Sequence, residues 1–485
     1  MAFLDPKTWS GKLFTGVWEK GSGDTVDIYE PATGDVLGSY SAATPEDVAK
    51  AASRAAQAQK EWALVKPEEK AAIMRRAGDL WNQHESEILQ WIIQEAGSVP
   101  AKAGLEVHMA SEICFVSSGL PHHDIGRVMP SNNDHWSFAR RRPSGVVSVI
   151  SPFNFPLILS IRSVAPALAL GNAVLLKPDP RTVISGGYVI ARIFEEAGLP
   201  QGLLQVLPGA ADVGEAVVTA PEVSVVSFTG STGAGRKVGE LASQHLKRVH
   251  LELGGNNALI VLPGADVAKA ASAAAFGSFL HQGQICMTTG RHIVHSSLYD
   301  EFVAALGEKA QNLPVGNPAS EQVALGPIID KGQFERIDSL VQETVEQGAR
   351  LVAGGPGEGL FYRPTVLADV SQEMAAYAQE VFGPVAPVIK FDTVEEAIAL
   401  ASENDYGLSL GILGDVGTAM EIADAVPSGI VHINEQTVAD EPNIPFGGVG
   451  ASGNGSRFGG AEANIEAFTE VQWLTVRPDI APYPF

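Results

Sequence analysis

The sequence predicts an α/β protein with two domains, each built around a mostly parallel sheet. Its 485 residues provide material for about three average domains. Hydrophobic residues make up 45% and charged residues 18% of the chain, so there is enough apolar surface for a large core. From residue 146 onward, short β-branched runs alternate with helix-like segments. This alternation predicts parallel sheets covered by helices on both faces.

The first 120 residues precede this alternation. Residues 1–40 are expected to form an extended lead-in with short strands. A helix is predicted to begin at residue 45, because Thr44 can cap it, Pro45 fits a first turn and Asp47 lies near the capping-box position. Helical spacing then continues to about residue 120, through 51–63, 68–83 and 88–95.

Strands are predicted from about residue 135, where the helical pattern ends. The segments His135–Arg142 and Gly145–Ile150 flank Pro143-Ser144, which predicts a hairpin at about 130–150. The first alternating series has predicted strands at 146–150, 173–176, 204–207, 224–228 and 248–251, and predicted helices at 160–170, 185–197, 211–219 and 233–244.

The glycine pair Gly254-Gly255 is the predicted boundary between the two domains. A second alternating series follows it and continues to about residue 434. Glycine and proline are dense after about residue 440. We therefore expect a first domain at 1–254, a second at 255–440, and a return of 441–485 to the first domain or to a partner.

Charge and cysteine content exclude several classes of protein. The net charge is −23 and no basic run is longer than Arg140–Arg142, which argues against a nucleic-acid-binding protein. The two cysteines are too few for a disulfide framework. The N-terminus lacks the pattern of a signal peptide, and no apolar stretch is long enough for a membrane helix. A cytoplasmic protein without a membrane partner is expected.

The two cysteines differ in their sequence surroundings. Cys114 lies on a helical stretch and is expected to be a small buried hydrophobe. Cys286 follows Gly283 and Gln284, a polar approach that contains glycine. A nucleophilic thiolate needs exposure and a positive local potential. The local sequence leaves a reactive and a structural Cys286 equally open.

A glycine-containing turn follows the predicted strand at 224–228. It runs from Thr229 to Gly235 and is followed by a helix. Glycines let the backbone approach a pyrophosphate, and a helix N-terminus supplies free N–H groups. The spacing differs from G-x-G-x-x-G, so a tight strand–helix turn without a ligand fits the same residues.

Three polar residues follow predicted strands, and each has more than one interpretation. Glu252 lies about 20 residues past the glycine turn and could be a ribose-binding acid, a general base or a surface carboxylate. Lys177 could reach a ligand crevice or stay solvated. Asn154, in a turn with two prolines and two aromatics, could donate to an oxyanion or bond its own backbone.

A metal site is not expected. His122 and His123 are adjacent, and neighbouring histidines rarely share one ion. No third ligand lies at a usual spacing from them.

Seven motifs together resemble one known family. They occur in order at residues 151–156, 176–178, 228–235, 251–255, 283–286, 380–385 (EVFGPV) and 445–448 (PFGG). This set resembles the aldehyde dehydrogenase superfamily over essentially the whole chain. The run 120–156 is most similar to the benzaldehyde and vanillin dehydrogenase branch. The resemblance implies a Rossmann-like cofactor domain, a second α/β catalytic domain and a small β element for oligomerisation.

The resemblance also implies roles for individual residues. Cys286 matches the nucleophile, Glu252 the general base rather than a ribose ligand, and Asn154 the side-chain half of the oxyanion hole. Lys177 matches the residue that binds the adenosine ribose, and Glu380 and Phe382 those at the nicotinamide. The full cofactor set comprises Ser151, Pro152, Phe153, Lys177, Gly214, Gly230, Ser231, Gly235, Leu253, Glu380 and Phe382. By position, the aldehyde is expected near Phe155, Leu159, Arg162, Leu280, Ile285, Met287 and Thr437.

The implied reaction is the NAD(P)-dependent oxidation of an aldehyde to its acid through a thioester on Cys286. Most of the expected pocket residues are apolar, which suits a benzaldehyde-like ring. Arg162 is the exception and could meet a ring hydroxyl or pair with an acid. The alternatives are an aliphatic or semialdehyde substrate, acyl transfer to coenzyme A, and a non-catalytic protein of the same fold.

Two positions depart from the family pattern. Many relatives carry a ribose-binding acid three residues after Lys177, where this chain has Pro180, followed by Arg181. NAD is therefore expected as the cofactor, with NADP also accepted. The pair Ser456-Arg457 stands where many relatives have Arg-Glu, whose acid joins a proton relay. The predicted hairpin and the tail 471–485 resemble the oligomerisation elements of the family, so a homodimer or homotetramer is expected.

Overall fold

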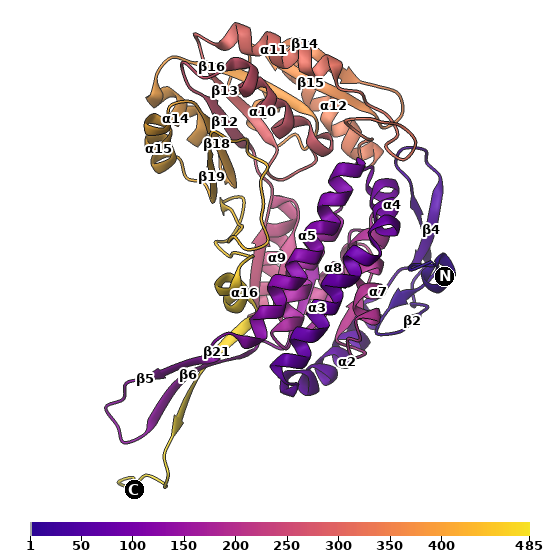
Figure 1. Ribbon diagram of the computed structural model, residues 1–485, viewed down its shortest axis with the longest axis vertical. Coiled ribbons are helices and arrows are strands. Elements are labelled where there is room, and N and C mark those ends of the chain that lie inside the picture. The colour runs from indigo at the N-terminus through magenta and orange to yellow at the C-terminus, as the bar shows by residue number, and fades with distance from the viewer. Residues whose placement is uncertain (1) are drawn as a thin grey trace.

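The computed structural model describes residues 2–485, which fold into two sheet-containing halves and a projecting arm (Figure 1). The first sheet has the strand order β11-β10-β7-β8-β9-β1-β2. Its central strands are parallel, and β1 and β2 extend it in antiparallel fashion. The strands are β1 (Leu13–Phe14), β2 (Trp18–Glu19), β7 (Val146–Ile150), β8 (Ala173–Lys177), β9 (Leu204–Val206), β10 (Val223–Thr229) and β11 (Arg248–Glu252).

Helices cover both faces of the first sheet. The predicted cap of α2 is confirmed, because Thr44 and Asp47 form a reciprocal capping box. The helices of this half are α1 (Pro6–Trp9), α2 (Pro45–Leu64), α3 (Pro67–Gln83), α4 (Glu85–Ala96), α5 (Pro100–Gly119), η1 (Leu120–His122), α6 (Pro156–Ala169), η2 (Ile184–Tyr188), α7 (Val189–Glu196), α8 (Ala211–Thr219), α9 (Thr232–Gln244) and α16 (Ala461–Phe468).

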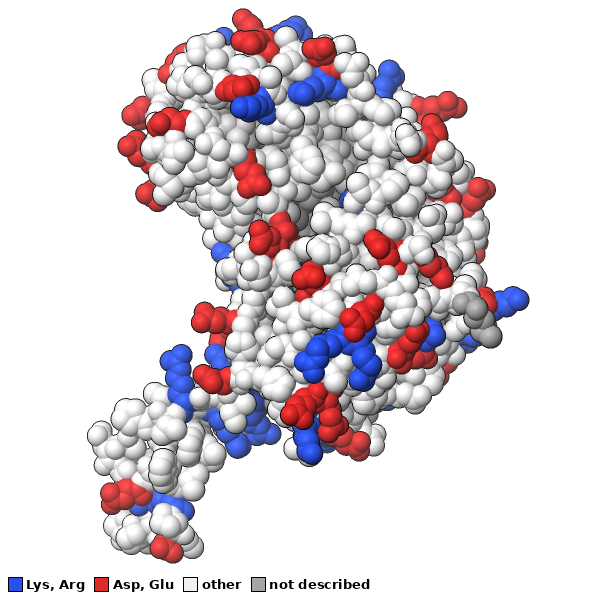
Figure 2. Space-filling view, viewed as in Figure 1, with Lys and Arg blue, Asp and Glu red and all other residues white. Residues whose placement is uncertain are grey.

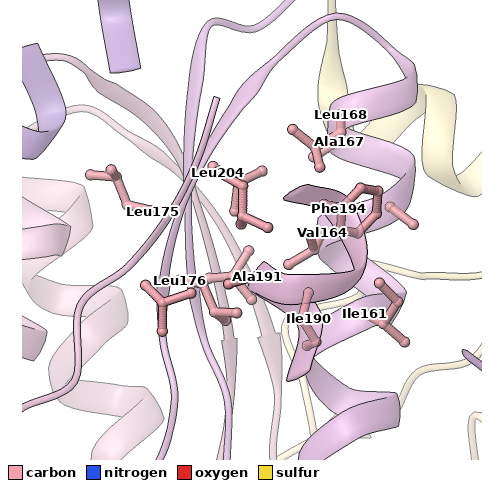
Figure 3. Packing of buried hydrophobic residues seen from close by; sticks show 14 of the residues in the cluster. Ile161, Val164, Ala167, Leu168, Leu175, Leu176, Ile190, Ala191, Phe194 and Leu204 are labelled. Atoms are coloured by element: carbon pink, nitrogen blue, oxygen red, sulfur yellow. The ribbon is translucent and has the colours of Figure 1, made fainter. Parts of the chain in front are cut away.

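One layer of the core of this half lies between the sheet and the helices α6 and α7 (Figure 3). Leu204 of β9 lies close to Val164 of α6 and Phe194 of α7, and all three are at most 2% exposed. Burying one such side chain contributes roughly 1.5–3 kcal/mol. This packing holds α6 rigidly against the sheet, and the N-terminus of α6 follows directly on the turn that contains Asn154.

The second sheet has the strand order β14-β15-β16-β13-β12-β18-β19, with only β14 and β15 antiparallel. The α/β prediction with two largely parallel sheets is confirmed. The strands are β12 (Asn257–Val261), β13 (Thr289–His295), β14 (Arg350–Pro356), β15 (Tyr362–Ala368), β16 (Val385–Phe391), β18 (Ser409–Leu413) and β19 (Ile430–Ile433). The helices are α10 (Val267–Phe279), η3 (Leu280–Gly283), α11 (Tyr299–Asn312), α12 (Lys331–Glu346), α13 (Ala375–Ala378), α14 (Val394–Ser402) and α15 (Val416–Ala425).

Two short pairings lie outside the large sheets: β3 (Thr25–Tyr29) with β4 (Val36–Ser41), and β17 (Tyr406–Gly407) with β20 (Val449–Gly450). The first large sheet ends in the chain at Glu252 and the second begins at Asn257. Only four residues therefore connect the last strand of the first sheet, β11, with the first strand of the second sheet, β12. None of the helices within residues 2–485 has the length and apolar character needed to cross a membrane.

The arm is a three-stranded antiparallel sheet that stands away from the body (Figures 1 and 2). It consists of β5 (Gly126–Met129), β6 (Trp136–Pro143) and β21 (Thr469–Val476), in the order β21-β6-β5. The predicted hairpin between His135–Arg142 and Gly145–Ile150 is therefore wrong. The hairpin forms between β5 and β6, whereas residues 146–150 form β7 of the first sheet. All five side chains of β7 are buried, which suits a central strand and not an arm.

Candidate active site

The carboxyl ends of four parallel strands form one wall of the site. The register pairs Ile150 with Lys177 and with Phe228, and Thr229 with Glu252. The loops that follow these strands therefore begin at one edge of the sheet, where ligands of such sheets bind. They line a cavity of about 510 Å³ that also reaches into the second half. Its lining includes Ser151, Pro152, Phe153, Asn154, Leu159, Lys177, Gly230, Ser231, Leu253, Cys286, Glu380 and Phe382.

Cys286 reaches this cavity on an unusual stretch of backbone. His281, Gln282 and Gly283 have positive φ angles of 48°, 56° and 63°. For the two non-glycine residues this conformation costs of order 1–3 kcal/mol each, and such backbone occurs mainly at functional sites. The carbonyl of Cys286 accepts a hydrogen bond of 2.8 Å from Asn257 Nδ2. Tertiary contacts thus hold the segment that carries the thiol in place.

Burial, followed by the charge of Glu380, raises the pKa of the Cys286 thiol to about 12, with Arg162 acting in the opposite direction. The side chain nevertheless keeps partial exposure through the cavity. The resting thiol is therefore neutral at pH 7 yet accessible. Cys114 is different, because it is fully buried and its sulfur accepts a hydrogen bond of 3.4 Å from Trp81 Nε1.

Glu252 is buried and not on the surface, so the surface interpretation of this carboxylate is wrong. Neither carboxyl oxygen has a hydrogen-bond partner among the residues that the structure describes. Burial raises the pKa of Glu252 well above its usual value, while the guanidinium groups of Arg162 and Arg457 act in the opposite direction. A carboxyl group with a raised pKa is suited to general base catalysis near neutral pH.

The turn that contains Asn154 is held by a buried ion pair on α5. Lys102 Nζ donates to the Asn154 carbonyl at 2.7 Å and lies 2.5 Å from Glu106 Oε1. Glu106 Oε2 accepts hydrogen bonds from the N–H groups of Leu157 and Ile158 at the start of α6. Lys102 thus satisfies the backbone carbonyl of the turn, while Asn154 itself lines the cavity.

Sequence reasoning missed this pair. The signal was available, because Lys102 and Glu106 are spaced i, i+4 within a helix whose other residues are mostly apolar or small. A charged pair on a face that must be buried indicates a structural or functional role.

In the turn from Thr229 to Gly235, two glycines lie where a larger residue would collide with neighbouring side chains. A Cβ atom at Gly230 would lie 2.6 Å from the Phe228 ring, and one at Gly235 would overlap the Leu253 side chain. Ser231 caps α9 by accepting from the Ala234 N–H at 3.3 Å. The turn therefore opens a helix N-terminus toward the cavity, a setting that suits a phosphate group.

The remaining predicted cofactor residues lie at both ends of the cavity. Lys177 is buried, and a Cβ atom at Gly214 would lie 3.7 Å from its Cε. Glu380 Oε1 accepts the Gly255 N–H at 2.9 Å, and burial raises the pKa of Glu380 to about 7. Phe382 meets Phe153 edge to face, with ring centroids 5.9 Å apart. Gly214 and Gly235 pack beside the cavity and do not line it.

Only some of the residues predicted to lie near the aldehyde are found together in the structure. Phe155, Leu280, Ile285 and Met287 belong to one apolar cluster that Cys286 also contacts. Leu159 lines the large cavity instead. Thr437 is fully buried, and its hydroxyl bonds the Met287 carbonyl at 2.7 Å.

Arg162 is paired with an acid. It forms an ion pair with Asp440, and its guanidinium lies 4.5 Å from the centroid of the Phe446 ring. Sequence reasoning missed both partners. Phe446 lies in the PFGG motif, which was a usable signal, whereas nothing in the sequence around Asp440 indicates this contact.

The cavity lining also includes charged and amide side chains outside the predicted cofactor set, namely Asp179, Arg181, Gln333 and Arg336. Arg181 forms an ion pair with Asp179. Its charge is therefore already partnered in this structure.

Comparison with known proteins places this site in a family. The aldehyde dehydrogenase family profile matches residues 18–474. The chain is 60% identical to a vanillin dehydrogenase from an Amycolatopsis species over the full length of both proteins. It is 47% identical to a benzaldehyde dehydrogenase [NAD(+)] from Pseudomonas putida, covering 98% of each.

A solved structure agrees with these sequence matches. A salicylaldehyde dehydrogenase from Pseudomonas putida G7, complexed with salicylaldehyde, superposes with a TM-score of 0.94 at 35% identity, covering 98% of this chain and 100% of that one. With a family match over nearly its whole length and relatives that share its fold, this chain belongs to the aldehyde dehydrogenase family.

Proposed function

We propose that this aldehyde dehydrogenase oxidises aromatic aldehydes of the benzaldehyde and vanillin type to their acids, with NAD as the cofactor. One observation carries the proposal. Cys286 lines the large cavity at the edge of the first sheet, and it also contacts the apolar cluster that includes Phe155, Leu280, Ile285 and Met287. The cavity suits a dinucleotide and the cluster suits an aromatic ring. The relatives named as vanillin and benzaldehyde dehydrogenases support the same substrate class.

Cys286 is the nucleophile of the proposed reaction. After the thiol gives up its proton, the thiolate attacks the aldehyde carbon and forms the anion of a thiohemiacetal. The loss of hydride to the nicotinamide then leaves a thioester. The Asn154 side chain and the Cys286 N–H stabilise the oxygen that becomes negative, a term of about 3 kcal/mol per donor. The Lys102 contact to the Asn154 carbonyl fixes the turn in which this donor lies.

Glu252 is the general base of the proposed second half. Its buried, unpartnered carboxyl group has a raised pKa, so its ionised form accepts a proton strongly. It activates the water that hydrolyses the thioester and releases the acid. Arg457 replaces the acid found in many relatives, and its guanidinium donates to the Gly448 carbonyl at 3.1 Å. The proton that Glu252 gains must therefore leave by a route without a carboxylate at residue 457.

The residues present fit a dinucleotide. The N-terminus of α9, where Ser231 lines the cavity, offers backbone N–H groups to the phosphates. Lys177 lies at the end that suits a ribose, with Gly214 packed beside it, and Glu380 lies at the end near Cys286. When bound, the nicotinamide accepts the hydride. Pro180 carries no charge to repel a 2′-phosphate, but Asp179 lines the cavity and the charge of Arg181 is partnered. We therefore propose a preference for NAD with weaker use of NADP.

We propose that residues 1–254 are the cofactor domain, 255–440 the catalytic domain, and 441–485 a return to the first domain that ends in the arm. Large apolar side chains on the arm are exposed, among them Trp136 at 65% and Trp473 at 73%. Exposed apolar surface of this kind is typical of subunit contacts. We propose that this surface is a subunit contact of a homodimer or homotetramer, and that the protein is cytoplasmic.

A panel of benzaldehyde, vanillin, 4-hydroxybenzaldehyde and hexanal, each with NAD and NADP, tests the proposal by following cofactor reduction. Aromatic aldehydes with NAD are expected to give the highest kcat/KM, and Cys286→Ala is expected to be inactive. A large advantage for hexanal would instead indicate an aliphatic or semialdehyde substrate. Product analysis with and without coenzyme A separates hydrolysis from acyl transfer, since only transfer yields a coenzyme A thioester.

A further inference from the structure

Arg181 connects the two halves of the protein at the cofactor cavity. It follows β8 in the first half, where its Nε and Nη2 atoms donate to the two oxygens of Asp179 at 2.8 Å. Its Nη1 donates to Asp330 Oδ2 in the second half at 2.5 Å. The guanidinium also lies 4.2 Å from the centroid of the Phe153 ring. One side chain thus contacts both halves, and its planar group is held in a single orientation.

Asp330 is the first link from Arg181 into the second half. It is the N-cap of α12, and its Oδ1 accepts the Gln333 N–H at 2.8 Å. Its other oxygen is the one that meets Arg181. The position of the α12 N-terminus is therefore tied to the loop after β8.

The first turns of α12 in turn hold the loop that carries Glu380 and Phe382. Gln333 Nε2 donates to the Phe382 carbonyl at 2.9 Å. Arg336 donates to the Glu380 carbonyl at 2.8 Å and to the Val381 carbonyl at 3.0 Å. A continuous set of contacts therefore runs from the loop after β8 through Arg181, Asp330 and α12 to residues 380–382.

These contacts span the cofactor cavity from one end to the other. Lys177 and the N-terminus of α9 form the end that suits a ribose and phosphates. Glu380 lies at the end near Cys286, close enough for its charge to raise the thiol pKa. The nicotinamide must lie near Cys286 to receive a hydride from the carbon bonded to it. The two ends of the cavity therefore bind different ends of the dinucleotide.

We propose that Arg181 is a positioning residue that sets the distance between the two ends of the cofactor site. Its link to Asp330 holds α12, and with it Glu380 and Phe382, in register with Phe153 and Lys177. The half-exposed Arg181–Asp330 pair adds little to global stability, so its effect lies in placing the nicotinamide end. The inference rests on the proposed use of a dinucleotide cofactor, and it is independent of which aldehyde is oxidised.

The variant Asp330→Asn tests this link. Asparagine caps a helix as well as aspartate does, so α12 keeps its N-cap while Arg181 loses its charged partner. We expect the Kd for NADH, measured by equilibrium fluorescence, to rise about 5- to 10-fold, in the range of typical couplings between sites. The Kd for AMP, measured by calorimetry, should stay unchanged, because AMP reaches only the ribose and phosphate end.

Lys331→Gln is the matched control. Lys331 is the next residue along and forms an exposed pair with Glu335 at the same end of α12. Its removal changes the charge at the helix start by one unit, opposite in sign to the change in Asp330→Asn, without touching Arg181, so both dissociation constants should stay at their wild-type values. A second variant, Arg181→Lys, keeps the charge but loses the forked geometry, and it should weaken NADH selectively as well.

Four results would overturn the inference. Unchanged NADH and AMP binding in Asp330→Asn would reduce the pair to a surface salt bridge. Equal weakening of both ligands would assign Arg181 to the ribose end alone. Wild-type protein that binds AMP but not NADH would overturn the cofactor proposal together with this one. Wild-type NADH binding with an unchanged Kd in both variants would overturn only the coupling.

Discussion

Cys286 lies in surroundings that favour the neutral form of its thiol. Burial and the Glu380 carboxylate raise its pKa, and a raised pKa means less thiolate at any given pH. Arg162 is the nearby group that favours the thiolate, but it is already paired with Asp440. The resting enzyme therefore holds a poorly reactive thiol beside an ionisable carboxyl group that opposes its ionisation.

The first prediction concerns the alkylation of this thiol. In a Cys114→Ser background, the rate of reaction of Cys286 with iodoacetamide should rise steadily from pH 7 to pH 10 without a plateau. Glu380→Gln removes the carboxylate that raises the pKa, so alkylation at pH 8–9 should be faster. Mass spectrometry of quenched samples gives both rates. A plateau below pH 8 would contradict the raised pKa.

The second prediction concerns Glu252. Glu252→Gln keeps the shape of the side chain but removes the base, so thioester hydrolysis should slow and kcat should fall by about 10²–10⁴. The first turnover should still release one equivalent of NADH, and intact mass analysis should detect the acyl-enzyme. In the wild type, hydrolysis should rise with pH through the raised pKa of Glu252, because only the ionised form accepts a proton. A variant within tenfold of the wild-type kcat would exclude this role.

At the scale of elements, α5 fixes the oxyanion turn through a buried ion pair. Lys102 and Glu106 are both without solvent exposure and lie on one face of the helix. They reach across to the Asn154 carbonyl and to the start of α6. An ion pair in this position places the turn against the helix with defined hydrogen bonds, which apolar packing alone does not specify.

The third prediction follows from that arrangement. Lys102→Met leaves the Glu106 carboxylate buried without its partner, which should lower the free energy of unfolding by about 3–5 kcal/mol. Urea denaturation followed by fluorescence measures the change. Lys50→Met on α2 is the control, because Lys50 also pairs with an acid at i, i+4 but is exposed, and its loss should leave the unfolding midpoint unchanged. Equal midpoints for both variants would contradict the proposed role.

Local sequence predicted element types better than strand partners. The capping box at Thr44 and Asp47 was confirmed because its signal lies within four residues. The hairpin at 130–150 was placed wrongly because the residues of a strand do not by themselves show which strand it pairs with. The composition of the two strands did differ: β7 is VVSVI, buried throughout, whereas β6 carries three arginines. That difference separates a central strand from a strand in an exposed sheet.

At the scale of the whole molecule, the arm projects from the body (Figures 1 and 2). Several of its large apolar side chains are exposed. It joins two distant parts of the chain, since β6 pairs along its length with β21. Such a sheet is too thin to bury its own side chains on both faces. We propose that a second copy of the chain packs on the exposed face of the arm.

The fourth prediction tests this covering. Trp473→Glu places a charge in the exposed apolar surface of the arm and should shift the mass measured by light scattering toward the monomer. Leu64→Glu is the control, because Leu64 is 86% exposed at the end of α2, on the body and not on the arm. Its mass should match the wild type. An unchanged mass for Trp473→Glu would place the subunit contact elsewhere.

The fold class, the family and the candidate catalytic residues could all be predicted from the amino-acid sequence. Alternating periodicity, glycine turns and the order of motifs are properties of neighbouring or successive residues. They can therefore be recognised without knowing how the chain folds. The set Cys286, Glu252 and Asn154 was identifiable for that reason, before any distance between the residues was known.

The surroundings of these residues depend on contacts between segments that are distant in the chain. Within residues 2–485, the carboxyl group of Glu252 is buried without a hydrogen-bond partner. Arg162 is paired with Asp440, and Arg181 is shared between Asp179 and Asp330. Along the chain, Asp440 lies 278 residues from Arg162, and Asp330 lies 149 residues from Arg181. Burial and charge pairing depend on which segments meet in space, and no local pattern records such meetings. The electrostatics of the site is therefore a property of the folded molecule.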